Sequence, residues 1–160
     1  VSAWVYLDAP DNAARCIVTK GFGQYYLRFS YFPLDTPVWE FVNVKKTEIW
    51  QGNSVPADTQ GQWTFLTGVR QGQRQLLYCN GILVDSTLNE WSIDGTNTIP
   101  EDLSIGKFIE GAAFEVHGGN CFFKGAIDEV RILRKASDAD WVRLCYMNQR
   151  IDNKLVEFMR

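Results

Sequence analysis

The chain has 160 residues and a mass of 18.3 kDa, which is the size of one domain that buries a core without needing cross-links. Its 16 basic and 19 acidic residues give a net charge of −3, and no run of Lys and Arg is longer than Lys45–Lys46, so we expect no nucleic-acid partner. Hydrophobic residues make up 46% and charged residues 22%, and no apolar run approaches the roughly 18 residues of a membrane span, which excludes a disordered chain and a membrane protein.

Short runs of alternating apolar and polar residues follow one another along the chain, separated by Gly, Asn, Asp and Pro. Alternation with a period of two is typical of strands that have one buried face. The predicted strands are Ser2–Leu7, Cys16–Thr19, Tyr25–Phe32, Trp39–Val44, Trp63–Arg70, Gln75–Cys79, Ile82–Ser86, Leu103–Lys107, Cys121–Phe123 and Ala126–Arg131. This series predicts an all-β fold, a two-sheet antiparallel β-sandwich, formed by a single domain over residues 1–160.

The clearest local signal is the pair Asn80–Gly81 between two apolar runs. Both residues adopt positive φ readily, so they predict a two-residue type I′ hairpin. Gln71–Gly72 predicts a turn before this hairpin. The three strands that these two turns connect are therefore expected to be antiparallel neighbours.

One short helix is expected near the end of the chain, over residues 136–150. Ser137 is its predicted N-cap, and Asp140 three residues later completes a capping box. The side that we expect to pack on the sandwich carries Trp141, Leu144 and Cys145. Residues 151–160 alternate again and predict either a last strand or a linker to a further module.

Four segments, in this order, resemble a known family. They are Ser2–Val5, Gln62–Arg70, Leu77–Val84 and Phe123–Ile132. They resemble the early core strand, the central strand, the tyrosine-rich hairpin and the closing strand of the laminin-G-like jelly roll, in the bacterial extracellular branch of the concanavalin A-like lectin/glucanase superfamily. The resemblance implies a concanavalin A-like jelly roll.

Members of this family usually begin with several strands before the one at Val1. The resemblance therefore implies either that the chain is truncated at its start or that those strands are supplied elsewhere. No signal-peptide pattern opens the sequence, so we expect a chain excised from a longer protein.

Two observations weigh against an enzyme. His117 is the one histidine of the chain, whereas hydrolytic and proton-transfer sites commonly rely on histidine. Glucanases with this fold use carboxylates at alternate positions of one strand, and the sequence has no Glu-x-Asp pattern. Asp128 and Glu129 are adjacent on a predicted strand, so we expect them to point to opposite faces.

The resemblance implies a structural calcium ion held in part by Asp128. Calcium takes about six to eight oxygen ligands, and the acidic partner that the family places early in the domain is missing with the early strands. In the alternative interpretation, Asp128 accepts hydrogen bonds from neighbouring backbone amides while Glu129 pairs with Arg131 or Arg143.

Four cysteines permit three disulfide connectivities, and none has the Cys-x-x-Cys spacing of a metal site. They are Cys16, Cys79, Cys121 and Cys145. All lie in apolar segments, so we expect at least two buried thiols and zero or one disulfide.

Aromatic residues make up 14% of the chain, and this surplus indicates a binding face. Aromatic rings stack on the apolar faces of sugars, while polar side chains bind the hydroxyl groups. The tryptophans assigned to the core are Trp4, Trp63 and Trp141. The candidate carbohydrate-binding residues are Trp91 first, then Trp39 and Trp50, followed by Tyr31 and Arg70.

The sequence therefore predicts a non-catalytic carbohydrate-binding module within a larger secreted bacterial protein that degrades polysaccharides. Its expected partner is a plant or microbial cell-wall glycan, and its expected location is outside the cell or on the cell surface. The first alternative is an adhesion or architectural surface module that binds no glycan. A hydrolase is the third possibility.

Overall fold

The computed structural model describes residues 1–9, 13–20, 24–31, 36–45, 49–90, 102–108, 121–150 and 152, with the backbone alone at residues 45, 49 and 50. The elements are β1 (Ser2–Leu7), β2 (Arg15–Lys20), β3 (Tyr25–Ser30), β4 (Val38–Lys45), β5 (Ile49–Pro56), β6 (Trp63–Gln71), β7 (Arg74–Cys79), β8 (Ile82–Leu88), β9 (Leu103–Ile105), β10 (Gly125–Arg131) and α1 (Ala139–Gln149). No helix within these ranges is long and apolar enough to cross a bilayer.

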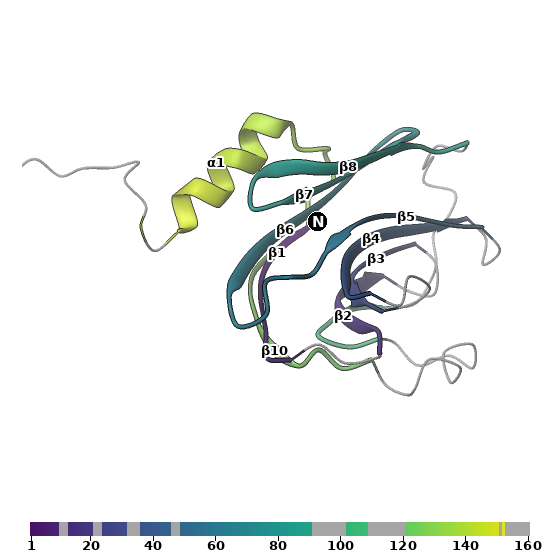
Figure 1. Ribbon diagram of the computed structural model, residues 1–160. Coiled ribbons are helices and arrows are strands. Elements are labelled where there is room, and N and C mark those ends of the chain that lie inside the picture. Colours follow the sequence, from purple (N-terminus) through teal and green to yellow (C-terminus); the bar gives the residue numbers. More distant parts are fainter. Residues whose placement is uncertain are drawn as a thin grey trace, which may run out of the picture.

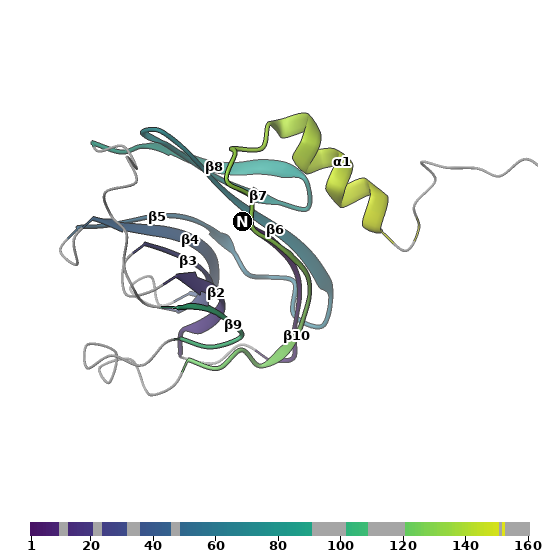
Figure 2. The ribbon, with the colours of Figure 1, turned by 180° about the vertical axis from the view of Figure 1, so that it is seen from behind.

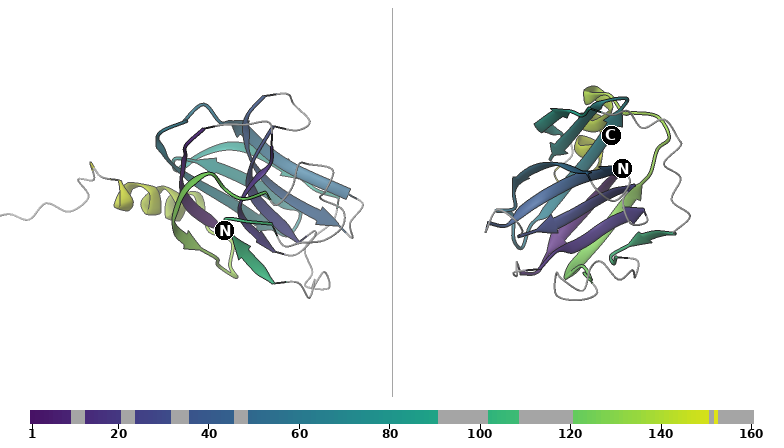
Figure 3. Two further views of the ribbon diagram at one scale, coloured as in Figure 1. Left: turned by 90° about the horizontal axis from the view of Figure 1, so that it is seen from below. Right: turned by 90° about the vertical axis from the view of Figure 1, so that its right-hand side faces the viewer.

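The strands form two five-stranded antiparallel sheets that face each other (Figure 1). The first sheet has the strand order β10-β1-β6-β7-β8, and the second has the order β5-β4-β3-β2-β9. Seen from in front and from behind, α1 lies on the far side of the first sheet from the second sheet (Figures 1 and 2). Figure 3 shows the layers from below and from the side. The predicted sandwich with one short C-terminal helix is confirmed.

The main core lies between the two sheets and is formed mainly by the side chains on their facing sides. Its buried members are Ala3, Val5, Leu7, Ile17, Val18, Leu27, Phe29, Trp39, Phe41, Ala57, Leu66 and Leu77. Gly68 lets the two sheets approach at one point, because a Cβ there would lie 2.2 Å from a ring carbon of Phe41. Burial of this apolar surface supplies most of the stabilisation, at about 25 cal/mol per Å².

The predicted hairpin is confirmed in its backbone geometry. Asn80 and Gly81 have φ values of 51° and 78°, as a type I′ turn requires. Asn80 also ties the hairpin to β6, because its side-chain oxygen accepts a hydrogen bond of 2.9 Å from the backbone N–H of Phe65. The strand order β6-β7-β8 confirms the predicted antiparallel neighbours.

Two strand predictions are wrong. The sequence did not predict β5, whose Gly52, Asn53 and Pro56 interrupt the apolar alternation; this strand lies at a sheet edge, where proline is tolerated. Cys121–Phe123 was expected to be a strand but is irregular. Its backbone is nevertheless bonded, since the carbonyl of Cys121 accepts a hydrogen bond of 3.0 Å from the N–H of Cys16.

The N-cap of helix α1 lies one residue later than the predicted N-cap, Ser137. Asp138 is the N-cap, and its carboxylate accepts a hydrogen bond of 2.8 Å from the backbone N–H of Trp141. A carboxylate in this position satisfies a free amide and interacts favourably with the helix dipole. The last predicted segment, 151–160, falls outside the described residues except at residue 152.

The side of α1 that packs on the first sheet also differs from the prediction. Val142 and Cys145 are buried against β1, β6 and β7, whereas Trp141 is 50% exposed and Leu144 is 49% exposed. The expected inward stripe is therefore wrong, apart from Cys145. The helix has two overlapping apolar stripes. The stripe of Val142, Cys145 and Tyr146 packs on the sheet, whereas Trp141 and Leu144 belong to the other, exposed stripe.

Candidate functional site

A cleft of about 650 Å³ opens on the outer face of the first sheet, beside the C-terminal end of α1. This cleft, called the outer cleft below, is lined by Trp4, Trp63, Asp128, Glu129, Tyr146, Gln149, Arg150 and Asp152. Its volume falls within the range of roughly 300–1,000 Å³ that small-ligand sites occupy. Strands distant in sequence, β1, β6 and β10, meet the end of the helix here.

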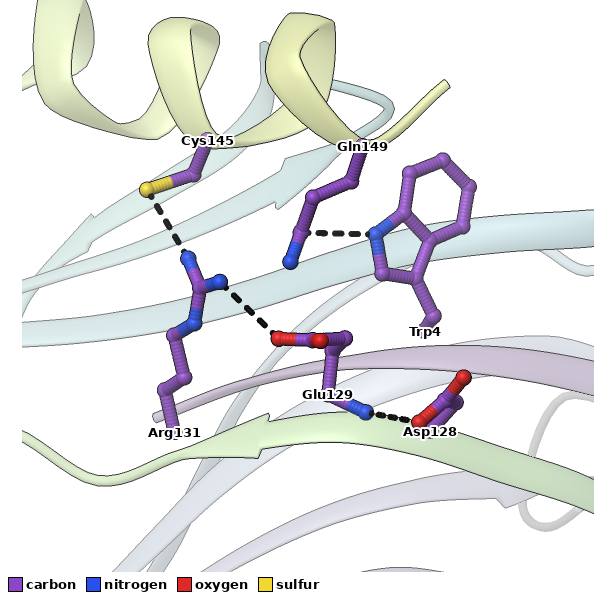
Figure 4. A network of polar contacts seen from close by, with 6 residues as sticks. All are labelled: Trp4, Asp128, Glu129, Arg131, Cys145 and Gln149. Atoms are coloured by element: carbon purple, nitrogen blue, oxygen red, sulfur yellow. Dashed lines mark hydrogen bonds and ion pairs between the residues drawn. The ribbon is translucent and has the colours of Figure 1, made fainter. Parts of the chain in front are cut away.

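The floor of the outer cleft is a stack of aromatic rings. Trp4 is only 9% exposed, and its ring centroid lies 5.7 Å from that of Tyr146 in a stacked arrangement and 5.3 Å from that of Phe65. The Trp4 indole N–H donates a hydrogen bond of 2.9 Å to Oε1 of Gln149, and Figure 4 shows these two side chains facing each other. The floor is therefore fixed by both ring packing and a polar contact.

Trp63 forms the open aromatic edge of the outer cleft. It is the first residue of β6, beyond the part of the sheet that α1 covers, and it is 46% exposed. The Tyr6 ring supports it from the side, with the centroids 5.8 Å apart and the planes tilted by 57°. The assignment of Trp63 to the core is wrong, whereas that of Trp4 is confirmed.

A β-bulge in β10 places two consecutive carboxylates at the outer cleft. Ser2 pairs with Arg131 and Trp4 with Asp128, so the register shifts by one residue between the two pairs. Glu129 has a φ of 50°, and both Asp128 and Glu129 line the cleft. The expectation that these two side chains point to opposite faces is wrong, because the bulge breaks the alternation at this point.

Contacts among the polar side chains hold this bulge in place, as Figure 4 shows. The Asp128 carboxylate accepts a hydrogen bond of 2.7 Å from the Glu129 backbone N–H, and Glu129 forms a 2.9 Å ion pair with Arg131. The Arg131 guanidinium also donates to the sulfur of Cys145 at 3.3 Å, which joins β10 to α1. These contacts agree with the alternative interpretation of Asp128 as an acceptor of a backbone amide.

A cation also lines the outer cleft. The guanidinium of Arg150 lies 5.3 Å from the centroid of the Tyr146 ring and forms a two-pronged ion pair with Asp152. Planar groups of this kind bind sugar hydroxyls well, because they present several donors or acceptors in fixed directions. The lining of the cleft thus combines the open ring of Trp63 with the carboxylates of Asp128 and Glu129 and the ion pair of Arg150 and Asp152.

Among the candidate sugar-binding residues, Trp39 is contradicted by the structure. It is 1% exposed and packs edge-on against Phe29, with 5.7 Å between the ring centroids. A ring with no open face cannot stack on a sugar, so Trp39 is a core residue. Its place in the sequence gave a signal, because Trp39 and Phe41 stand two positions apart and share the inner face of β4.

The other candidates do not gather at the outer cleft. Trp91 lies outside the described residues, and Trp50 is described only by its backbone, which pairs with Val44. Tyr31 follows β3, is partly exposed and does not line the outer cleft.

Arg70 lines a second cavity, of about 340 Å³, together with Val1, Tyr25 and Asn43. Its guanidinium donates to the carbonyl of Gly72 at 2.8 Å and to the side chain of Gln75 at 3.1 Å. Burial lowers the pKa of Arg70. These donors serve the fold of the β6–β7 turn.

The structural calcium ion at Asp128 stays a prediction. In the described part of the chain, no three acidic, histidine or cysteine side chains gather in a way that would hold a metal ion. The bulge brings Glu129 beside Asp128, but one of the Asp128 oxygens already accepts a backbone hydrogen bond. This donor set does not fit an ion that takes about six to eight oxygen ligands.

A family model described as the concanavalin A-like lectin/glucanases superfamily matches residues 1–143. A search of curated protein sequences found no significant match. The matched range contains all the described strands of both sheets and the first turn of α1.

Solved structures of similar fold include three from bacteria. A Bacteroides ovatus protein with a provisionally assigned carbohydrate-binding role is 17% identical with a TM-score of 0.66, and the match covers 89% of this chain and 38% of that one. The CBM40 domain of a Ruminococcus gnavus IT-sialidase, bound to α2,3-sialyllactose, is 14% identical with a TM-score of 0.61, covering 89% and 80%. The binding domain of Botulinum neurotoxin DC, in complex with rat synaptotagmin II, is 13% identical with a TM-score of 0.58, covering 94% and 35%.

These structural likenesses concern the fold. The chain spans less than two fifths of the Bacteroides protein and of the neurotoxin binding domain, and four fifths of the CBM40 domain. The order of the strands in the two sheets, the presence of the closing strand β10 and the family match all indicate the same fold. The chain belongs to the concanavalin A-like lectin/glucanase superfamily.

Proposed function

We propose that this domain is a non-catalytic carbohydrate-binding module that holds its glycan in the outer cleft. The observation that carries the proposal is the half-exposed ring of Trp63 beside the paired carboxylates of Asp128 and Glu129. A sugar has apolar faces and a hydroxylated edge, and this arrangement offers a surface for each. The carbohydrate-binding domains among the proteins of similar fold support the same function.

The binding mode follows from the positions of the side chains. A sugar ring stacks on Trp63, and its hydroxyl groups donate to Asp128 and Glu129, whose backbone is fixed by the bulge. The floor around Trp4 is already packed and hydrogen-bonded, so binding orders few side chains. Pre-organisation of this kind lowers the entropic cost of association.

The charges of the outer cleft favour a neutral glycan. Three carboxylates, those of Asp128, Glu129 and Asp152, line it together with the single guanidinium of Arg150. Arg150 is paired with Asp152 and Arg131 is paired with Glu129, so the charge that no guanidinium balances is that of Asp128. An anionic sugar would meet unfavourable like charges here, whereas hydroxyl groups of a neutral cell-wall polysaccharide find acceptors.

The wider setting that we propose is a larger secreted bacterial protein that degrades polysaccharides. A binding module linked to a catalytic domain raises the effective concentration of that domain at its substrate. Affinity in the micromolar to millimolar range is sufficient for this role, because the covalent linkage keeps the local concentration of the module at the glycan high.

Calorimetric titration tests this proposal with glucan, xylan and mannan oligosaccharides. We expect Trp63→Ala to weaken binding at least tenfold, because it removes the open ring. Trp141→Ala is the matched control, since Trp141 is equally exposed but lies outside the outer cleft, and it should bind as the unmodified chain does. Equal binding by both variants would place the glycan elsewhere, and thermal melting of each confirms that it is folded.

One observation favours the alternative of an adhesion or architectural module. The edge strand β8 exposes Ile82, Leu83, Val84 and Leu88. Exposed apolar residues on an edge strand mark surfaces that contact another protein. Absence of binding to any glycan in the titration, by the unmodified chain, favours this alternative.

A further inference from the structure

Two of the four cysteines lie together on the outer face of the second sheet. Ile17 and Val18 of β2 belong to the core between the sheets, whereas Cys16, before the register shift in this strand, belongs to a separate buried cluster. Cys16 and Cys121 belong to one buried cluster, which also contains Tyr26 and Phe108. The two cysteines are 1% and 3% exposed.

Backbone and side-chain contacts both join this pair. The backbone N–H of Cys16 donates a hydrogen bond of 3.0 Å to the carbonyl of Cys121, and the two thiols are hydrogen-bonded to each other. Each Cα atom lies within two covalent bonds of the backbone hydrogen bond, so the two Cα atoms are at most about 7 Å apart. Disulfides span Cα separations of roughly 4.4–6.8 Å.

The remaining cysteines are kept from each other and from this pair by the sheets. Cys79 packs against the core between the two sheets, whereas Cys145 lies in the cluster between the first sheet and α1. The first sheet therefore separates Cys79 from Cys145. This arrangement excludes all three connectivities that pair the four cysteines. The one bond that it permits joins Cys16 and Cys121.

The surroundings favour a thiolate on one member of the pair. The hydrogen bond from Cys16 and the charges of Arg28 and Arg15 lower the pKa of Cys121 to about 7. The hydrogen bond with Cys121 and burial raise the pKa of Cys16. The fold therefore holds the two sulfurs close enough for each to change the ionisation of the other.

We infer that Cys16 and Cys121 are the site of an intramolecular disulfide bond. Its formation needs a small-molecule disulfide such as oxidised glutathione as the oxidant. The Cys121 thiolate attacks one glutathione sulfur and releases one glutathione, and the Cys16 sulfur then attacks the mixed disulfide and releases the second. The two cysteines lose two protons and two electrons in total, and oxidised glutathione takes them up and becomes two molecules of reduced glutathione.

The bond would join segments about a hundred positions apart, which constrains the unfolded chain strongly. The bond would attach residue 121, which precedes β10, to β2 of the second sheet. Because the pair is buried in the folded domain, the oxidant reaches it while the chain folds. The inference concerns the fold and holds whether or not the outer cleft binds a glycan.

Peptide mapping of the unmodified chain tests the inference. The reduced chain is refolded with oxidised and reduced glutathione, its free thiols are blocked with N-ethylmaleimide in denaturant, and it is cleaved with trypsin. Each cysteine then lies on its own peptide, namely 16–20, 75–107, 108–124 and 144–150. We expect peptide 16–20 to be linked to peptide 108–124, with the other two carrying the blocking group. Four blocked cysteines, or a bond that includes Cys79 or Cys145, would overturn the inference.

Thermal melting supplies an independent measurement. A phosphine reductant should lower the Tm of the oxidised chain by roughly 5–15 °C. The double variant Cys79→Ala/Cys145→Ala should show the same shift, and Cys16→Ala/Cys121→Ala should show none. A shift in this last variant would contradict the assignment.

Discussion

The indole N–H of Trp4 donates a 2.9 Å hydrogen bond to the side-chain oxygen of Gln149, and so joins the first strand of the domain to the last residue of its helix. This contact closes the floor of the outer cleft against α1. Trp4 also stacks on Tyr146, so the helix end is held by one polar and one aromatic contact. The cleft therefore depends on the docking of α1.

Gln149→Ala tests this dependence. It leaves the largely buried Trp4 N–H without an acceptor, and we expect the free energy of unfolding to fall by about 1–2 kcal/mol. Urea denaturation followed by tryptophan fluorescence measures the change. Arg143→Ala, at an exposed position of the same helix, should cost less than about 0.5 kcal/mol. Similar losses in the two variants would argue against a specific role of the contact.

Gly125→Ala should disrupt the pairing of β1 with β10. Gly125 has a φ of 141°, and a Cβ there would lie 1.9 Å from the carbonyl oxygen of Tyr6, so the backbone must move. We expect a loss of at least about 3 kcal/mol in chemical denaturation. Gly72→Ala is the control, because Gly72 also has positive φ but no atom within 4 Å, and should cost about 1–2 kcal/mol. A Gly125 variant as stable as the Gly72 variant would contradict this description.

The acidic character of the outer cleft predicts its ligand preference. A neutral oligosaccharide should bind at least tenfold more tightly than the same oligosaccharide carrying a sialic or uronic acid, a difference of about 1.4 kcal/mol. The double variant Asp128→Asn/Glu129→Gln should narrow this difference, as should added salt, because these carboxylates are exposed. Calorimetry at two salt concentrations measures both effects. Tighter binding of the acidic sugar would refute the proposed preference for neutral glycans.

Cys79 predicts a loss of stability in alkaline solution. Burial raises the pKa of Cys79 from 9.0 to about 11. The unfolded thiol ionises at the lower value and the folded thiol keeps its proton to the higher one, so unfolding releases a proton between pH 9 and 11. The contribution of Cys79 to stability is complete below pH 9 and is lost as the pH rises through 11. We expect the stability difference between the unmodified chain and Cys79→Ala to shrink over this interval in denaturation curves, and a constant difference would contradict it.

Local patterns predicted a large part of the fold. The alternation in Ser2–Leu7 and the pair Asn80–Gly81 act over a few residues, so their structures follow from short-range sterics and one-sided burial. β5 escaped prediction because its glycine, asparagine and proline interrupt the apolar alternation, and the proline is tolerated there because the strand lies at a sheet edge. That place is set by the whole topology.

The candidate site was predicted less well, for a different reason. Alternation shows which residues share a face, but not what covers that face. Trp39 faces the other sheet and is buried, whereas Trp63 stands beyond the end of the helix and is open. Trp141 lies on the exposed apolar stripe of α1, which does not pack on the sheet. Nothing local distinguishes these cases.

Glu129 illustrates a second limit. Its positive φ is adopted by few non-glycine residues and has no reliable mark in the sequence, so the alternation rule was continued through it. The pairing with β1, more than a hundred positions away, fixes the bulge. Such a feature depends on both strands together.

The bulge in β10 has an evolutionary consequence. Ile127 and Val130 keep their contacts with the core on either side of it, while the additional residue is accommodated on the outside. A gain or loss of one codon at this point would therefore alter the chemistry of the surface and leave the interior intact. This strand therefore offers a position where the outer surface can change while the contacts of Ile127 and Val130 with the core are kept.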